Sequence, residues 1–275
     1  MIKTVITAPR GAMDSLIVQE CYKHPEIEVV GCVGTPGKDY IGRDAGHVCG
    51  LGTDIGALVY DDLEAVMADG LTLIDACDVV IDYSTIALSM DVLAKCLAHH
   101  KGLLCGTTGF SDEQLAAFAK ASEEIPIMQT ANTSYVVTVM KKLLREAAAL
   151  LKDKACMEII ELHSDTKLDA PSGTAIEMAQ EMVAGMTGSE SETGEVTITE
   201  DGKMKLGDVT FHSVRAGNTP SSHHVLFGCQ GEMFQITHDA YDWRCYAIGA
   251  CDAALFVGNK LAAGEAGSYG MSDLL

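Results

Sequence analysis

Residues 2 to 128 alternate between short apolar runs and segments with helical periodicity. "IKTVIT" (2–7) and "IEVVGCV" (27–33) enclose a segment in which Met13, Leu16, Ile17 and Cys21 recur at helical spacing. "DVVIDYS" (78–84), "GLLCGTTGF" (102–110) and "IPIM" (125–128) continue the series, with helical segments between them. Parallel strands joined by helices bind ligands where the strands end. We therefore expect an α/β domain with a Rossmann-like doubly wound parallel sheet.

Two local patterns in this part of the chain predict helices. "SDEQ" (111–114) is typical of a capping box, and "DDLEAVMA" (61–68) has helical character with Asp61 or Asp62 as its cap. Both segments lie between expected strands, as crossover helices do.

The pattern changes near residue 132. A long helical segment (134–151) leads to the strand "CMEIIELH" (156–163), another helix and three strand-like runs. This order predicts a second, α+β domain with an open mixed, mostly antiparallel sheet. The helical segment 244–258 is apolar enough to return to the first domain. We expect a dinucleotide-binding domain of residues 1–130 and 241–275, and a substrate-binding and oligomerisation domain of residues 131–240.

The charge balance excludes several classes of partner. A formal net charge of −20 argues against nucleic acid and anionic membrane surfaces, which need cationic patches. No apolar run approaches the roughly 20 residues of a membrane span. None of the ten cysteines has C-x-x-C spacing, so we expect buried thiols, no metal site and a cytoplasmic location.

The first strand ends in the turn "TAPRGAMDS" (7–15). A glycine-rich phosphate-binding turn laid over it places Ala8, Gly11 and Asp14 at the three glycine positions. Taken alone, this pattern leaves a nucleotide site and an ordinary turn equally open. Arg10 and the N–H groups of Gly11 and Ala12 suit a phosphate, whereas an inward-facing Asp14 would repel it.

The second strand ends in "VGTPGKD" (33–39). This segment lacks the acidic residue that binds a ribose 2′-hydroxyl, and Thr35 and Lys38 after Gly34 could accept a 2′-phosphate. The sequence therefore favours NADPH over NADH.

The segment "ELHSDTKLDAPSGT" (161–174) concentrates polar chemistry between two apolar runs. We expect a helix to start here with Pro171 near its first position and Ser172 or Asp169 as cap. The N–H groups of Ser172, Gly173 and Thr174 would then bind a carboxylate. His163 and Lys167 precede them and suit proton delivery. The competing interpretation is a capped helix behind a polar loop.

The stretch "EIIELHSDTKLDAPSGTA" (158–175) closely resembles the signature of the 4-hydroxy-tetrahydrodipicolinate reductase family of lysine and diaminopimelate biosynthesis. "CGTTGF" (105–110), "TANTS" (130–134), "VRAG" (214–217) and "ITHDA" (236–240) follow the family's order and spacing. The resemblance covers essentially the whole chain. It implies NAD(P)H-dependent reduction of a cyclic dicarboxylate with loss of water, and a homotetramer.

The resemblance also implies roles for individual residues. His163 and Lys167 match the catalytic pair, and Gly173 and Thr174 match the loop that binds the substrate carboxylate. The pyrophosphate turn and the segments that line the nicotinamide correspond to Ala8, Pro9, Arg10, Gly11, Ala12, Met13, Gly106, Thr107, Thr108, Thr130, Ala131, Asn132 and Thr133.

Four features depart from the family pattern. Ser164, followed by Asp165, replaces a second His that contacts substrate, and the glycine turn is incomplete. Trp243 and Ser222 replace an Arg and an acidic residue. Asp165 suggests an alternative, an amine or imine dehydrogenase that acts on another amino acid. The incomplete glycine turn suggests another, a non-catalytic metabolite-binding member.

His223 and His224 are adjacent on an expected strand and point to opposite faces, and we expect them at the surface or an interface.

Overall fold

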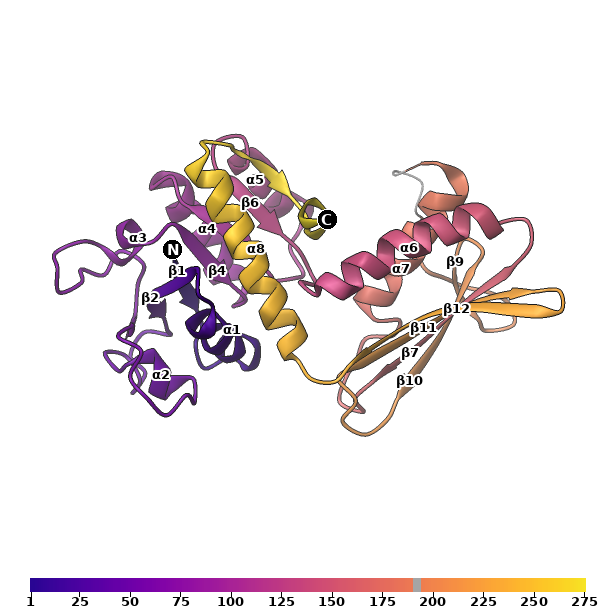
Figure 1. Cartoon of the computed structure of the whole chain (residues 1–275), viewed down its shortest axis with the longest axis horizontal. Coiled ribbons are helices and arrows are strands. Elements are labelled where there is room, and N and C mark those ends of the chain that lie inside the picture. Colours follow the sequence, from indigo (N-terminus) through magenta and orange to yellow (C-terminus); the bar gives the residue numbers. More distant parts are fainter. Residues whose placement is uncertain (190–193) are drawn as a thin grey trace. The chain divides into compact units, whose positions relative to one another are not determined.

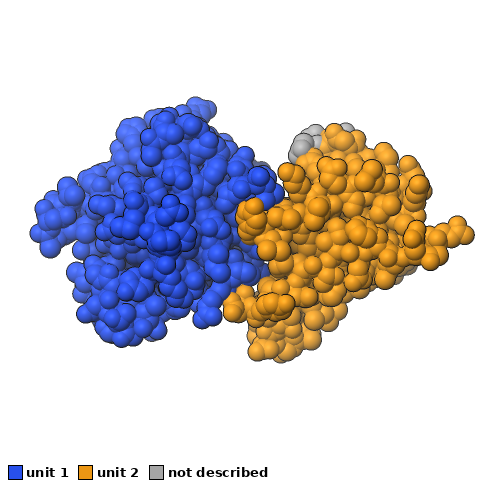
Figure 2. Space-filling view, viewed as in Figure 1, with its two compact units in different colours: residues 1–134, 244–275 blue, residues 135–243 orange. Residues whose placement is uncertain are grey.

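The computed structural model describes residues 1–189 and 194–275. The chain forms two compact units (Figure 2). Unit 1 consists of residues 1–134 and 244–275, and unit 2 of residues 135–243. Each has a hydrophobic core of its own.

Unit 1 is built on a seven-stranded sheet in which every recorded pairing is parallel. Its strands are β1 (Ile2–Thr7), β2 (Ile27–Val33), β3 (Leu58–Tyr60), β4 (Val79–Asp82), β5 (Gly102–Cys105), β6 (Pro126–Gln129) and β13 (Gly267–Tyr269). The order is β13-β6-β5-β4-β1-β2-β3: strands after β1 are added first on one side of it and then, from β4 onward, on the other, so the strand order reverses between β1 and β4. This arrangement confirms the predicted Rossmann-like doubly wound sheet.

Helices cover both faces of this sheet (Figure 1). Helices α1 (Ala12–Lys23) and α8 (Arg244–Ala262) pack together on one face, and the short η1 (Met271–Leu274) contacts α8. The other face packs against α3 (Leu73–Ala76), α4 (Ile86–Ala98) and α5 (Asp112–Ala121). Because both faces are buried, β4 and β5 carry no exposed residue, which explains their continuous apolar sequences. A further short helix, α2, spans Ala45–Val48.

The expected helix at 61–68 is wrong, whereas the capping box at Ser111 is confirmed. Asp62 accepts a hydrogen bond from the N–H of Glu64 at 2.7 Å, and a turn replaces the helix. An aspartate that bonds its own downstream backbone offers an alternative to helical pairing. At the start of α5, Ser111 and Gln114 exchange the two bonds of a capping box.

Unit 2 contains a six-stranded sheet. Its strands are β7 (Cys156–His163), β8 (Thr197–Ile198), β9 (Met204–Leu206), β10 (Val209–Arg215), β11 (Ser221–Cys229) and β12 (Glu232–Ala240), in the order β12-β11-β7-β10-β9-β8. Only the β7–β10 pairing is parallel among the described strands of this sheet, which confirms the predicted mixed, mostly antiparallel sheet. Helices α6 (Tyr135–Leu151) and α7 (Gly173–Thr187) share a core with it.

The central strand β7 alternates strictly between buried and partly exposed residues after Cys156. Met157, Ile159, Glu161 and His163 are the buried members and share one face, since side chains alternate along a strand. Met157 and Ile159 enter the apolar core. Glu161 places a carboxyl group on the same buried face, and His163 follows at the strand's end.

Candidate active site

The residues expected to bind a cofactor all follow strands of the parallel sheet. They lie in the segments after β1, β2, β5 and β6, which leave the same edge of the sheet because the strands are parallel. Between β1 and β4, where the strand order reverses, a crevice for a dinucleotide is expected. The structure therefore gathers these residues on one edge of unit 1.

The turn after β1 keeps the shape of a phosphate-binding turn despite its sequence. Ala8 has φ +44°, a left-handed conformation that favours glycine. The N–H of Gly11 donates to the carbonyl of Ala8 at 2.7 Å. Helix α1 then begins at Ala12, and the N–H groups of Ala12 and Met13 have no partner within the described parts of the chain. Its start can therefore receive an anion.

Asp14 lies in the first turn of α1 and is only 3% exposed. Burial raises the pKa of its carboxyl from 3.8 to about 8; the nearby Asp82 charge adds to the rise, and the N–H groups of Asp14 and Tyr83 oppose it. At neutral pH the group is therefore protonated and uncharged. A neutral carboxyl removes the repulsion that an anionic Asp14 would exert on a diphosphate.

A buried carboxylate that sequence reasoning missed lies at the end of β4. Asp82 accepts hydrogen bonds from the hydroxyls of Thr7 (2.7 Å), Ser84 (2.5 Å), Thr107 (3.3 Å) and Ser89. Thr7 ends β1, so Asp82 joins the two strands that border the crevice. The signal in the sequence was the Asp that ends the apolar run "DVVIDYS".

Tyr83 supports the loop after β5 from the neighbouring strand end. A Cβ atom on Gly106 would lie 2.1 Å from the Tyr83 ring, so residue 106 has to be glycine for this packing. The Tyr83 hydroxyl donates to Thr133 Oγ1 at 3.0 Å. Thr107 is buried and Thr108 is exposed.

The remaining cofactor candidates differ in exposure. Gly34 is buried, and a Cβ there would lie 2.5 Å from the Tyr40 ring, whereas Thr35 and Lys38 are exposed. The guanidinium of Arg10 lies 5.6 Å from the centre of the same ring.

Of the other candidates, Pro9 is buried and Ala131 is exposed, and the Thr130 hydroxyl donates to the carbonyl of Asn132 at 3.1 Å. The helix start, Arg10 and exposed Lys38 together fit an anionic dinucleotide such as NADPH or NADH.

In unit 2, His163 is part of a buried ionic chain. Its Nδ1 bonds Glu161 Oε2, and Arg215 holds both oxygens of Glu161 at 3.0 and 2.8 Å. Burial by itself would raise the pKa of Glu161, but the hydrogen bonds from His163 and Arg215 outweigh it and lower the pKa from 4.5 to about 2. Glu161 is therefore a permanent anion beside the ring.

Lys167 is tied to the same region by Asp169. The Lys167 Nζ lies 2.8 Å from Asp169 Oδ1, and the backbone N–H of Lys167 donates to the Ser164 carbonyl at 3.1 Å. Arg215 reaches this loop as well, because it donates to the Asp169 carbonyl at 2.6 Å. The structure thus brings His163 and Lys167 into one network.

Ser172 caps helix α7, which confirms one of the two expected caps, Ser172 and Asp169. Its hydroxyl accepts from the N–H of Ala175 at 3.2 Å. The expectation that Pro171 occupies the first helical position is wrong: the helix begins at Gly173, so Pro171 precedes the cap. Gly173 has open space where a side chain would be, and Thr174 is half-buried. An anion therefore has room to approach the helix start.

The departures at Ser164 and Asp165 lie in the loop after β7. The Ser164 hydroxyl pairs with that of Thr166 at 2.8 Å. Asp165 is exposed, and its N–H donates to the Gly217 carbonyl at 3.0 Å.

His223 is not at the surface, contrary to expectation. It is 1% exposed, both ring nitrogens are without a partner among the described residues, and its ring lies edge-on to His163 at 5.4 Å. The reason is its register: His223 is paired with Glu161 on β7 and shares the buried face. His224 points the other way and is partly exposed.

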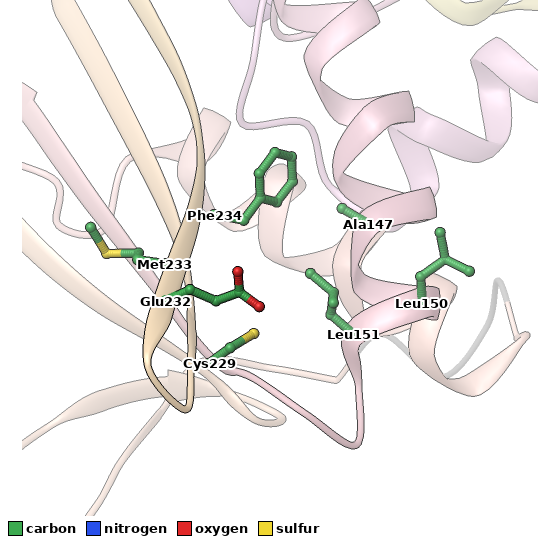
Figure 3. Close-up of a pocket in the computed structure, with 7 residues that line it drawn as sticks. All are labelled: Ala147, Leu150, Leu151, Cys229, Glu232, Met233 and Phe234. Carbon is green, nitrogen blue, oxygen red and sulfur yellow. The ribbon is translucent and has the colours of Figure 1, made fainter.

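A hollow lies at the opposite end of unit 2's sheet from His163. Leu150 and Leu151 at the end of α6 face Phe234 and Glu232 of β12 across a pocket of about 540 Å³ (Figure 3). The strand register places the pocket near Gly228, whose partner is Cys156, the first residue of β7. The pocket is mainly apolar and contains none of the proton-transfer candidates.

Within residues 1–189 and 194–275, no group of three or more metal-binding side chains is arranged around a common point. In the same described residues, no helix has both the length and the apolar character needed to span a bilayer.

A doubly wound sheet with a free anion-binding helix start, joined to a second unit that carries histidine and lysine, is the architecture of an NAD(P)H-dependent oxidoreductase. The family model described as "Dihydrodipicolinate reductase, N-terminus" matches residues 2–133, and "Dihydrodipicolinate reductase, C-terminus" matches residues 136–275. The chain belongs to the dihydrodipicolinate reductase family, which confirms the resemblance seen in its motifs.

Individual relatives agree with this assignment. The chain is 36% identical over 282 aligned residues to the 4-hydroxy-tetrahydrodipicolinate reductase of Alkalilimnicola ehrlichii, across 99% of this chain and 98% of that protein. The dipicolinate-bound dihydrodipicolinate reductase of Paenisporosarcina sp. TG-14 is similar in structure, with a TM-score of 0.75, 26% identity and full coverage of both chains. GenD2 from gentamicin A biosynthesis, solved with NAD, shares the fold at TM-score 0.63 and 11% identity, over 99% of this chain and 90% of its own.

Proposed function

We propose that this protein catalyses the NAD(P)H-dependent reduction of 4-hydroxy-tetrahydrodipicolinate to tetrahydrodipicolinate, with release of water, in lysine and diaminopimelate biosynthesis. The full-length similarity to a reductase of that name supports the reaction. The observation that carries the assignment of residues is the network that joins His163 and Lys167 next to the capped start of α7.

The proposed substrate is a cyclic dicarboxylate. The start of α7 suits one carboxylate, because Gly173 leaves room and the helix N-terminus favours negative charge. Ser164, in the loop after β7, is the proposed further contact.

The reaction adds one hydride and one proton to the substrate, and the 4-hydroxyl leaves as water. When bound, NADPH or NADH supplies the hydride. Lys167 delivers the proton at the reduced centre, and His163 assists with proton movement at its Nε2, since Nδ1 bonds Glu161. Asp169 holds the Lys167 ammonium in place.

The cofactor is proposed to lie along the edge of the parallel sheet in unit 1. The turn from Ala8 to Met13 receives the diphosphate, and the loops at 106–108 and 130–133 line the nicotinamide. Exposed Thr35 and Lys38 favour the 2′-phosphate of NADPH.

Turnover tests the proposal directly. Protein, NADPH and enzymatically prepared 4-hydroxy-tetrahydrodipicolinate are mixed, and absorbance at 340 nm is followed. We expect NADPH to be consumed only when all three are present. The same assay is run in parallel with NADH. Absence of turnover with both nucleotides would reject the proposed function.

A second candidate is an amine or imine dehydrogenase with another amino-acid substrate. Asp165 favours it, because this exposed carboxylate next to the proton-transfer loop can hold a substrate ammonium. A panel of amino and imino acids with NAD(P)H or NAD(P)⁺ separates the two candidates. Titration calorimetry with both reduced nucleotides tests the non-catalytic alternative, which predicts no binding.

We further propose a homotetramer that resides in the cytoplasm. The face of unit 2's sheet opposite α6 and α7 presents Ile160, Leu162, Val214 and Met233, the last two 39% and 60% exposed. A second copy of the chain would cover this face. Sedimentation velocity checks the oligomeric state, and Val214→Asp with Met233→Asp should dissociate it. The cysteines among the described residues are all free thiols, as is usual in a reducing compartment.

A further inference from the structure

We propose that Glu161 is the positioning residue of His163, and that the Glu161–Arg215 pair also holds the loop that carries Lys167. This inference rests on the proposed function, because it assigns His163 and Lys167 to proton transfer. Neither Glu161 nor Arg215 needs to touch substrate in this role.

The location of Glu161 supports the first half of the proposal. It is fully buried, two residues before His163 on the same face of β7, where its neighbours along the strand are apolar. A carboxylate on such a face is costly unless each oxygen has a partner. Oε2 bonds His163 Nδ1 and both oxygens bond Arg215. The carboxylate is therefore fixed, and it fixes the histidine ring in turn.

Arg215 supports the second half. It ends β10 and is the direct register partner of His163. Its guanidinium forms a forked pair with Glu161 and also donates to the Asp169 carbonyl at 2.6 Å. Asp169 in turn holds Lys167 at 2.8 Å. One rigid cation thus links the strand that bears the histidine to the loop that bears the lysine.

The charges around His163 give this arrangement a chemical consequence. Glu161 is the anion in contact with its ring, and Arg215 is the cation behind that anion. On the β11 side lies His223, and beyond it His238, 6.2 Å from His223 between ring centres. Burial lowers the pKa of His223 to about 3, so it is neutral. Glu161 is therefore the charged partner that fixes the ring, and its bond to Nδ1 leaves Nε2 for the reaction.

The tautomer of His163 tests the inference without changing Glu161. A neutral ring that donates from Nδ1 to Glu161 carries its proton on Nδ1. Histidine-selective ¹⁵N labelling of the wild-type protein is expected to show the Nδ1–H form, with His163→Gln used to assign the signal. An Nε2–H tautomer would overturn the proposal.

Glu161→Gln tests the role of the charge. We expect the preference of His163 for the Nδ1–H tautomer to weaken, because the anionic acceptor at Nδ1 is replaced by a neutral amide. The kcat should fall about 10-fold or more, with the KM for NADPH unchanged. The matched control is Glu181→Gln, which breaks an Arg145–Glu181 pair in the same unit and should alter neither. An unchanged His163 tautomer together with an unchanged kcat in folded Glu161→Gln contradicts the proposal.

A second variant is needed in case the first does not fold, because Glu161→Gln leaves the partly buried Arg215 without its anion. Glu161→Gln combined with Arg215→Met removes both charges and should show the same change in the His163 tautomer. The resonance measurements need no turnover, so the two hypotheses separate. A changed tautomer without wild-type turnover rejects the proposed function alone, and turnover with an unchanged tautomer rejects this inference alone.

Discussion

Asp14 and Gly11 lie against each other at the start of α1: a Cβ atom on Gly11 would fall 2.3 Å from Asp14 Oδ2. The acid therefore occupies space beside the residue whose missing side chain lets a diphosphate approach the backbone. Its other oxygen, Oδ1, is buried without a partner among the described residues. The Asp14 carboxyl is uncharged at neutral pH and acquires its negative charge only in alkaline solution, since its pKa is raised to about 8.

This alkaline charge predicts that cofactor affinity depends on pH. Above pH 8 the Kd for NADPH should rise by up to about tenfold per pH unit, because binding then requires Asp14 to take up a proton. Asp14→Asn should bind NADPH with little dependence on pH. Calorimetric titrations between pH 6.5 and 9.5 measure both proteins, and an equal alkaline weakening in Asp14→Asn would exclude Asp14 as the cause.

The same group predicts how stability changes with pH. The folded-state pKa of Asp14, about 8, is above its ordinary value of 3.8, so the folded chain holds a proton that the unfolded chain releases between these values. The free energy of unfolding should therefore decrease as pH rises through this window, by at most about 1.4 kcal/mol per unit from this group. Urea unfolding at pH 5, 7 and 9 should show a smaller decrease for Asp14→Asn than for the wild type.

Ala8→Gly should stabilise the protein. Ala8 is held at φ +44°, where a Cβ atom costs about 1–2 kcal/mol and glycine is unstrained. After the greater flexibility of glycine in the unfolded chain is subtracted, we expect a gain of about 1 kcal/mol or less. Ala116→Gly, on the exposed side of α5, should lower stability by about 1 kcal/mol. Thermal or urea unfolding measures the change in the free energy of unfolding for each variant. A loss of stability in both would contradict the strain at Ala8.

Asp82→Asn should destabilise unit 1. The carboxylate accepts from four hydroxyl groups, two on each oxygen; asparagine keeps one acceptor oxygen, and its amide nitrogen cannot accept the other two bonds. Leaving buried donors unmatched costs about 1–3 kcal/mol each in the worst case, so we expect a loss of about 3 kcal/mol. Asp91→Asn, which breaks an exposed pair with Lys95 on α4, should change stability by less than about 1 kcal/mol. Similar effects of the two substitutions in urea unfolding would contradict the central role of Asp82.

Lys167→Ala should lower kcat by about 100-fold or more, as expected when a positioned proton donor is removed. The folded state should persist, because Lys167 is only partly buried and pairs with an exposed Asp169. Lys203→Ala removes an exposed lysine from the same unit, where it pairs with Asp201, and should leave kcat unchanged. Steady-state assays at saturating NADPH decide the matter, and undiminished turnover would remove Lys167 from the mechanism.

The regular parts of the fold were predictable because each has a strong local pattern. The runs of β4 and β5 are continuously buried since both faces of the sheet are covered, and the capping box at Ser111 marks a helix start. The error at 61–68 arose because the Asx turn at Asp62 and the helical periodicity compete over the same residues. Local patterns cannot decide such a competition.

The candidate site was predictable where residues are adjacent in sequence. His163, Lys167 and Ser172 share one segment, so the motif placed them together. Glu161 and Arg215 are 54 residues apart and meet through the pairing of β7 with β10. The alternation of β7, which puts Glu161 among inward-facing residues, was the available signal for its burial. The burial of His223 depends in the same way on the register of β11, which the sequence did not specify.

The discontinuity of unit 1 has a consequence for the order in which the chain assembles during synthesis. Helix α8 supplies Ala250, Ala254 and Val257 to the core that lies against α1, and β13 forms one edge of the sheet. Both are translated after all of unit 2. The nucleotide-binding half therefore emerges first from the ribosome yet completes its core last, whereas unit 2 is contiguous and can close as soon as residue 243 has emerged. A nascent chain stalled before α8 would carry a finished unit 2 and an α1 face without its cover.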